Sequence, residues 1–161
     1  GRVYAQLPDQ SKCKDATKTA FKIIERKSKI DSLSEEGLKP EKIVGEIQFE
    51  NVHFHYPNRP NIKILNGLNL KINSGQSNAL VGPSGCGKST TISLLLRFYD
   101  VENGAIYLDG VDIRKLNINW LRSKIGLVSQ EPILFNTTIF ENICNGDITR
   151  NNVRKCDILK V

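Results

Sequence analysis

Residues 82–89 of this chain read Gly-Pro-Ser-Gly-Cys-Gly-Lys-Ser, which matches the pattern G-x-x-x-x-G-K-[S/T]. Glycines at this spacing let the backbone curl, so that successive N–H groups point into one concavity that suits an anion. The apolar segment 79–81 precedes the loop as a predicted buried strand, and 90–98 follows as a predicted helix. This order of strand, loop and helix favours phosphate binding by the loop. The alternative is a glycine-rich turn that only joins the strand to the helix.

Two side chains of the loop have chemical roles in this interpretation. Lys88 would reach the β- and γ-phosphates of a nucleotide as a mobile charge, and Ser89 would give its hydroxyl to Mg²⁺. The pattern therefore predicts binding of a nucleoside triphosphate with Mg²⁺. The predicted binding residues of the loop are Gly82, Pro83, Ser84, Gly85, Cys86, Gly87, Lys88 and Ser89.

The bulk composition is that of an ordinary globular domain. The chain has 161 residues, 39% of them hydrophobic and 25% charged, which is enough for one domain with a core. Its net charge of +6 comes from basic residues scattered among acids, so we expect a solvated surface and no nucleic-acid partner. No apolar run approaches the length of a bilayer span.

Two further features concern the cellular context. The four cysteines, Cys13, Cys86, Cys144 and Cys156, lie far apart, which predicts neither a zinc site nor a disulfide framework and fits a reducing compartment. The chain contains no methionine and begins with glycine, so we expect it to be a piece of a longer protein.

The N-terminal part of the chain predicts a helix followed by a linker. Residues 14–27 carry apolar side chains at helical spacing, with Lys and Arg on much of the other face. Residues 28–42 are charged, lack periodicity and contain Gly37 and Pro40, which is typical of a linker.

Strand patterns follow the linker. Residues 47–54 predict one strand, and 62–65 and 68–72 predict a hairpin around a turn at Asn66-Gly67. Further predicted elements are a turn at Asn103-Gly104, a strand at 105–108, a turn at Asp109-Gly110, a helix at 117–124, a strand at 125–128 and a helix around Ile139, Phe140 and Ile143. Together they predict an α/β fold, in which a P-loop nucleotide-binding core packs beside an antiparallel β subdomain.

Three segments in order resemble one family. They are Phe-His-Tyr-Pro-Asn-Arg-Pro at 54–60, the loop with Thr90 at 82–90, and Leu-Val-Ser-Gln-Glu-Pro-Ile-Leu-Phe at 127–135. They resemble the nucleotide-binding domain of ATP-binding cassette exporters of the multidrug-resistance, P-glycoprotein type. The resemblance implies that residues 1–44 are a helix and linker following a transmembrane domain, and that 45–161 are part of a nucleotide-binding domain with an incomplete P-loop NTPase core.

The resemblance assigns roles to further residues. Tyr56 matches the aromatic side chain that stacks on adenine, and Gln130 matches the glutamine that contacts Mg²⁺ and the attacking water. Thr90 joins the nucleotide-binding set, and Lys88 and Gln130 are the predicted catalytic residues. Packing on a neighbouring proline is the alternative for Tyr56, and a solvated loop position is the alternative for Gln130. Arg59 either lies near the nucleotide or makes a surface salt bridge.

Several family motifs do not occur in these 161 residues. There is no Leu-Ser-Gly-Gly-Gln, no catalytic glutamate after a Walker B strand, and no switch histidine. The segment 106–109 ends in Asp109 like a Walker B strand, but Gly110 stands where the glutamate is required. We therefore predict that the parent protein is an ATPase that drives export, and that this chain alone binds nucleotide weakly without turnover.

The resemblance also implies partners and a location. The partners are the transmembrane domains of the same transporter and a second nucleotide-binding domain, in a head-to-tail ATP sandwich. The implied location is the cytoplasmic face of a membrane, the plasma membrane in particular. A GTPase is disfavoured because no Asn-Lys-x-Asp occurs. A truncated, non-catalytic module that pairs with a full-length transporter remains open.

Overall fold

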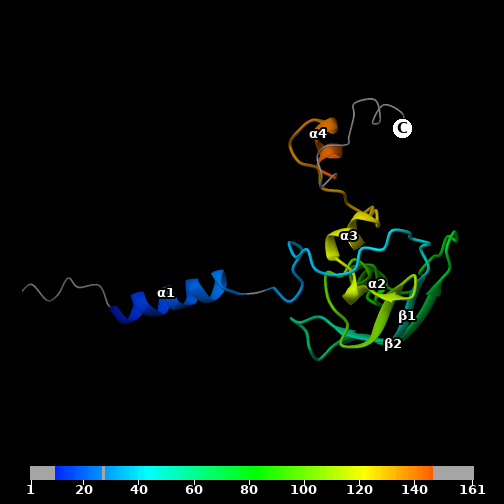
Figure 1. The fold of residues 1–161 in the computed structure, drawn as a ribbon. Helices are drawn as coiled ribbons and strands as arrows, with labels where there is room; N and C mark the ends of the chain where they lie inside the picture. Colours follow the sequence, from blue (N-terminus) through cyan, green and yellow to red (C-terminus); the bar gives the residue numbers. More distant parts are fainter. Residues whose placement is uncertain (1–9, 27, 147–161) are drawn as a thin grey trace, which may run out of the picture. The chain divides into compact units, whose positions relative to one another are not determined.

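The computed structural model describes residues 10–26 and 28–146, and side chains from residue 14 onward. Its elements are α1 (Gln10–Ile24), β1 (Ile47–His55), β2 (Lys63–Ile72), α2 (Lys88–Leu95), β3 (Asn103–Leu108), β4 (Val111–Asp112), the 3₁₀ turn η2 (Ile113–Lys115), α3 (Ile118–Ser123) and α4 (Ile139–Cys144) (Figure 1). The chain divides into two units, residues 1–125 and 126–161, and each is described by itself.

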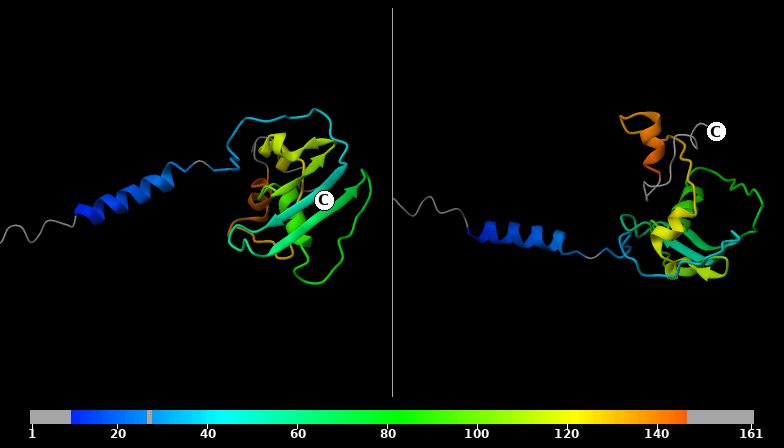
Figure 2. Two further views of the ribbon diagram at one scale, coloured as in Figure 1. Left: turned by 90° about the horizontal axis from the view of Figure 1, so that it is seen from below. Right: turned by 45° about the horizontal axis from the view of Figure 1, so that its top comes forward.

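A four-stranded antiparallel sheet in the first unit confirms the predicted β subdomain. The strand order is β2-β1-β3-β4, and Figure 2 shows the long strands β1 and β2 side by side. Phe49, Val52 and Phe54 of β1 are buried in a core that also receives Leu94 of α2 and Leu121 of α3, and the step of three between Phe49 and Val52 coincides with a register shift of β1. The sheet and α2 thus share one apolar core, formed by Phe49, Val52, Phe54, Leu65, Leu94, Ile106, Leu108, Ile113, Leu116 and Leu121.

The predicted hairpin at Asn66-Gly67 is wrong. β2 runs without interruption through both residues and pairs with β1 on either side of them, at His53 with Asn66 and at Val52 with Leu68. Gly67 is the extra residue of a β-bulge and has a φ of 78°. Both a β-bulge and a hairpin turn can require a glycine with positive φ, so the sequence does not distinguish them. Here β2 pairs with β1 on both sides of Gly67, which shows a bulge.

The predicted turn at Asn103-Gly104 is also wrong, because both residues belong to β3. Gly104 has a φ of 85° and lies against an irregularity of β1. A Cβ built on Gly104 would come within 2.3 Å of the carbonyl oxygens of Glu50 and Asn51. The glycine is therefore required by close backbone approach between two strands rather than by a chain reversal.

The turn at Asp109-Gly110 is confirmed, and its aspartate has a structural role. Both residues have positive φ, 52° and 78°, as a two-residue reversal between β3 and β4 requires. The carboxylate of Asp109 accepts backbone N–H bonds from Val44, Gly45 and Glu46 at 2.7–2.8 Å. These bonds fasten the chain before β1 to the turn after β3, so the Asp109 carboxylate has a structural role and does not resemble that of a Walker B aspartate.

The two short apolar strands predicted at 79–81 and 125–128 are not strands in the structure. Residues 79–81 form no regular secondary structure and are exposed, and Val81 has 92% of its surface open. Residues 125–128 form no strand either, and Val128 is 94% exposed. In the part of the chain that the structure describes, neither segment pairs with a strand, although the N–H of Ile125 donates to the carbonyl of Arg122 in the preceding turn. A strand without a neighbour leaves its backbone groups to water, so the pattern alone does not produce one.

The predicted helices are confirmed with shifted bounds. α1 covers Gln10–Ile24 rather than 14–27, and the chain after it forms turns and loops apart from a single parallel bridge between Leu38 and Leu116. α3 begins after Asn117, whose side chain caps it. α4 begins with a capping box between Thr138 and Glu141.

Candidate functional site

The glycine-rich loop leads directly into α2. Its backbone is exposed from Gly82 to Cys86, and Gly87, with a φ of 94°, is the residue before the helix. A Cβ on Gly87 would come within 2.7 Å of Cδ2 of Leu65, so glycine is required both for its conformation and for space. No side chain caps α2, so the first N–H groups of the helix remain directed out of its start.

The ammonium group of Lys88 lies within the turn of the loop. Its Nζ donates to the carbonyl oxygens of Gly82 at 2.8 Å and Pro83 at 2.7 Å, and lies 3.4 Å from Sγ of Cys86. These acceptors are the loop's own backbone and a thiol, and among the described residues no carboxylate pairs with the lysine. An anion that enters the loop therefore meets a cation that is not neutralised by an acid.

The two hydroxyl residues after Lys88 differ in their surroundings. Ser89 is exposed, and in the described part of the chain no hydrogen bond is made by its hydroxyl. Thr90 is 5% exposed, and its hydroxyl lies 3.0 Å from the hydroxyl of Tyr56. The Ser89 hydroxyl is thus open to solvent at the start of α2, whereas the Thr90 hydroxyl is paired with that of Tyr56.

Tyr56 follows β1 and lines an open pocket of about 500 Å³ together with Pro57, Asn58, Arg59 and Tyr99. Its ring meets those of Phe54 and Tyr99 nearly at right angles, with interplanar angles of 79° and 88°. An aromatic ring beside an open pocket offers a surface on which a nucleotide base can stack. The first unit therefore joins a phosphate-type loop to an aromatic pocket through the contact between Tyr56 and Thr90.

The sequence of this unit and its neighbour matches a known family. The family model for the ABC transporter domain covers residues 65–160, which includes the whole loop and α2. This chain belongs to the ABC transporter family. The predicted α/β fold with a P-loop NTPase core and an antiparallel sheet is thereby confirmed at the level of the family.

Curated relatives of this ABC transporter chain include multidrug transporters from fungi and a nematode. It is 56% identical to "ABC multidrug transporter atrD" of Emericella nidulans over 146 residues, which are 91% of this chain and 11% of the relative. It is 53% identical to "Multidrug resistance protein pgp-1" of Caenorhabditis elegans over 155 residues, which are 95% of this chain and 12% of the relative. It is 50% identical to "ABC multidrug transporter mdr1" of Aspergillus fumigatus over all 161 residues, which are 12% of that protein.

The chain thus spans about a tenth of the length of the relatives it matches. Among the described residues of this ABC transporter chain, no helix is both long and apolar enough to cross a bilayer.

Gln130 lies in the second unit of the ABC transporter chain, in a loop before α4. The structure brings Tyr56, Thr90 and the glycine-rich loop together in the first unit, whereas Gln130 belongs to the unit that is described separately. The role of Gln130 at Mg²⁺ therefore stays a prediction. The same holds for the roles of Lys88, Ser89 and the loop backbone toward a nucleotide.

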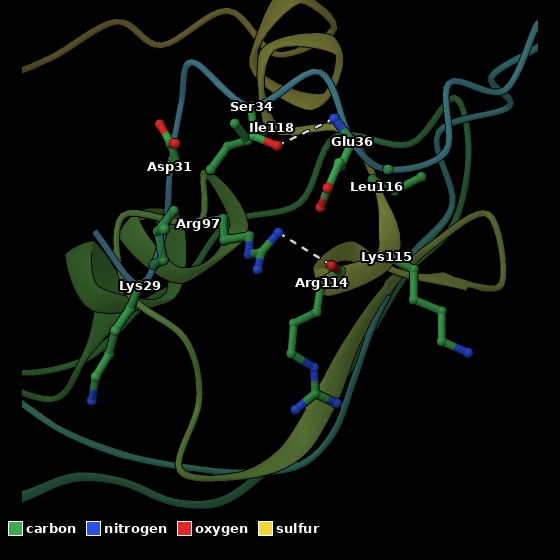
Figure 3. Close-up of a pocket in the computed structure, with 11 residues that line it drawn as sticks. Lys29, Asp31, Ser34, Glu36, Arg97, Arg114, Lys115, Leu116 and Ile118 are labelled. Carbon is green, nitrogen blue, oxygen red and sulfur yellow. Dashed lines mark hydrogen bonds between the residues drawn. The ribbon is translucent and has the colours of Figure 1, made fainter. Parts of the chain in front are cut away.

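A second cavity of the first unit, of about 420 Å³, lies between the linker and the residues around η2 (Figure 3). Four basic and two acidic side chains line it, and its arginines already have partners. Arg97 pairs with Asp100 at 2.9 Å and donates to the carbonyl of Arg114, while Arg114 pairs with Asp112 at 2.6 Å. With its guanidinium charges satisfied, this cavity is a poorer candidate for a nucleotide than the loop and the Tyr56 pocket.

Sequence reasoning missed one residue of the aromatic pocket. Tyr99 follows α2 in an Arg-Phe-Tyr-Asp segment whose only sequence signal is an aromatic residue after an apolar helix. Its contact with Tyr56 joins positions 43 apart in number, which no local pattern reveals. Arg59 was left open between two roles. It lines the same pocket, and no ion pair is formed by Arg59 within residues 28–146.

Proposed function

We propose that this chain is the ATP-binding segment of a transporter that couples ATP binding and hydrolysis to export of a substrate across a membrane. The observation that carries the proposal is the arrangement of Lys88 inside the loop turn, at the start of α2, with the Tyr56 pocket tied to the first turn of the same helix. Membership in the ABC transporter family supports it.

The residues of the site fit ATP and Mg²⁺ in their chemistry. The loop offers backbone N–H groups and an ammonium group to phosphate oxygens, and Tyr56 offers a ring to adenine. Mg²⁺ binds through few protein oxygens and several phosphate oxygens and waters, so the exposed Ser89 hydroxyl suffices as a ligand from the loop. Bound Mg²⁺ would neutralise charge on the phosphates, and Gln130 is proposed to contact it.

We propose that these 161 residues do not hydrolyse ATP on their own. Phosphoryl transfer depends on positioning and on stabilising charge, and besides a residue that contacts the attacking water it needs a group that polarises that water. The sequence contains no Leu-Ser-Gly-Gly-Gln and no Walker B glutamate. We propose that the chain alone binds MgATP weakly, and that hydrolysis belongs to the parent protein.

The parent protein is proposed to be an integral membrane exporter with this segment on the cytoplasmic face. The relatives' names describe multidrug transporters, so a multidrug-type substrate range is proposed for the parent as well. The proposed partners are the transmembrane domains of the same protein and a second nucleotide-binding domain that completes a head-to-tail ATP sandwich.

Binding of a fluorescent ATP analogue, with MgATP in competition, tests the proposal directly. Lys88→Ala is expected to abolish detectable binding, because it removes the only charge within the loop turn. Tyr56→Ala is expected to weaken binding without abolishing it, by about 1–3 kcal/mol for the lost stacking. Lys71→Ala is the matched control, since Lys71 is an exposed lysine near the opposite end of β2 from the residues that contact Gly87, and its side chain pairs with Glu46.

Two outcomes would contradict the proposal. If wild type and Lys88→Ala bind MgATP with equal affinity, the glycine-rich loop is not part of the nucleotide-binding site. A steady ATPase rate of the purified chain that disappears in Lys88→Ala would instead leave the binding site intact and overturn the claim that the chain alone does not turn over.

A further inference from the structure

The side chain of Tyr56 is held by two contacts that both come from the segment beginning at the glycine-rich loop. Its hydroxyl lies 3.0 Å from Oγ1 of Thr90, in the first turn of α2. Its ring meets the ring of Tyr99, which lies beyond the end of α2, with 5.3 Å between centroids and 88° between planes. One continuous piece of chain therefore begins at the phosphate loop and carries Thr90 and Tyr99, two of the neighbours of Tyr56.

The bond between Thr90 and Tyr56 is a specific one. A buried threonine in a helix commonly donates to the carbonyl four residues earlier, as Thr91 does to Gly87 at 3.0 Å. Thr90, which is 5% exposed, instead pairs with the Tyr56 side chain. Two adjacent buried hydroxyls thus have different partners, one within α2 and one across to the aromatic pocket.

The aromatic contacts restrict the ring of Tyr56 further. Phe54 is 4% exposed and contacts Tyr56 with 5.1 Å between centroids and Tyr99 with 5.6 Å. The three rings therefore touch one another in pairs. The two pairs that include Tyr56 are near-perpendicular, whereas Phe54 and Tyr99 are tilted at 54°. Near-perpendicular pairs are favourable and directional, so they fix the orientation of the Tyr56 ring as well as its position. Tyr99 remains 37% exposed and lines the same pocket as Tyr56.

We propose that Thr90 and Tyr99 are positioning residues for Tyr56, so that the segment whose start binds the phosphates also sets the ring against which adenine packs. The inference rests on the proposed function and adds two residues to it. Thr90 acts through its hydroxyl on Tyr56, in addition to any contact of its backbone with phosphate. Loss of either positioning residue reduces the contribution of the base to binding more than that of the phosphates.

The ratio of two dissociation constants measures this effect. Binding of MgATP and of inorganic tripolyphosphate with Mg²⁺ is measured on the 161-residue chain, and the ratio of the two constants isolates the contribution of the base. Tyr56→Phe and Thr90→Val are each expected to lower that contribution about two- to tenfold, the range for one lost hydrogen bond. The double variant is expected to lose no more than either single variant, because both remove the same bond.

Tyr99 is tested by the same ratio. Tyr99→Leu is expected to lower the contribution of the base severalfold, whereas Tyr99→Phe, which keeps the ring contact, is expected to retain it. Thr91→Val is the matched control for Thr90→Val, since it removes a neighbouring buried hydroxyl that does not touch Tyr56, and its ratio is expected to equal that of wild type. Circular dichroism verifies folding. Tyr56→Phe decides the Thr90 contact where Thr90→Val fails to fold, and Tyr99→Met replaces Tyr99→Leu if needed.

The outcomes separate this inference from the proposed function. An unchanged ratio in Tyr56→Phe and in the Tyr99 variants, with binding still lost in Lys88→Ala, overturns the positioning roles and leaves ATP binding in place. A wild-type chain that binds neither ligand, or a Lys88→Ala variant that binds both normally, overturns the proposed function and this inference together.

Discussion

The carboxamide nitrogen of Asn117 lies 2.9 Å from the carbonyl oxygen of Glu36, across 81 positions of the sequence. It also donates to the carbonyl of Ser34 at 3.1 Å, while its Oδ1 accepts from the backbone N–H of Trp120 and caps α3. Asn117 is 2% exposed, and its backbone N–H bonds to the carbonyl of Leu38. One buried side chain therefore fastens the linker to the domain and begins a helix of the domain.

Asn117→Asp is expected to release the linker while keeping the helix. Aspartate still accepts the Trp120 N–H, but its carboxylate has no donor for the two linker carbonyls and faces them with a negative charge. We expect a loss of about 1–3 kcal/mol in unfolding free energy. Hydrogen exchange of residues 34–38 should accelerate while that of α3 stays slow.

Asn117→Ala serves as the comparison, because it loses both the linker bonds and the cap, so exchange should accelerate in α3 as well. Unchanged exchange of residues 34–38 in Asn117→Asp would show that backbone pairing at Leu38, and not the carboxamide, holds the linker.

The sequence predicted those parts of the fold that local chemistry decides. The start of α2 follows from the glycine loop, β1 from its alternation, and the turn at Asp109-Gly110 from two residues that tolerate positive φ. The predictions at Gly67 and Gly104 failed because positive φ serves turns and bulges alike. Only pairing with β1, which no short window contains, distinguishes the two.

The candidate site likewise combines residues that a local motif reveals with residues that only the tertiary structure reveals. The loop from Gly82 to Ser89 and the aromatic character of Tyr56 were visible in the sequence, because each has a local motif. Tyr99 was not visible, since its contact with Tyr56 depends on the tertiary packing of α2 against β1 in the shared core. The strand predicted at 79–81 has apolar residues but no hydrogen-bonded neighbour among the described residues, and such a neighbour is a tertiary property.

Gly104→Ala is expected to destabilise the chain by more than about 2 kcal/mol. The added Cβ would lie 2.3 Å from two backbone carbonyl oxygens of β1, which cannot yield without breaking the ladder, and φ is already 85°. Gly75→Ala is the control, with a φ of 71° and open space around the new Cβ, and should lose only about 1 kcal/mol. Urea unfolding of both variants measures the two losses in unfolding free energy. Equal losses would mean that the positive φ, and not the close contact of the new Cβ, causes the destabilisation at Gly104.

Asp112 is expected to contribute a stability that depends on pH. Burial acts to raise the pKa of its carboxyl, but hydrogen bonds from the side chain and backbone of Arg114 and the charges of Arg114 and Lys115 prevail and hold that pKa below its usual value. A lowered pKa in the folded state means that the contribution is present above about pH 4, the pKa of an unfolded aspartate, and is lost as pH falls through the folded value.

Asp112→Asn should therefore lower the unfolding free energy at pH 7 by no more than about 1 kcal/mol, because the Arg114 partner is partly exposed. The difference from wild type should shrink below about pH 4. Urea unfolding at several pH values measures it, with Glu35→Gln as an exposed control. A difference that stays constant from pH 7 to pH 3 would show that the carboxylate charge does not contribute.

Cys86 is expected to be the site at which alkylation blocks nucleotide binding. Its side chain is exposed in the loop turn, and Sγ lies 3.4 Å from Nζ of Lys88. A maleimide adduct there would fill the space that phosphates are proposed to occupy and displace the lysine, so binding of MgATP should be lost. In turn, MgATP should slow labelling of Cys86.

Mass spectrometry of labelled peptides measures the extent of Cys86 labelling, both before binding assays and in the presence of MgATP. Cys144, a free cysteine of the second unit, is the internal control. Equal labelling of Cys86 with and without saturating MgATP would place the nucleotide away from this loop.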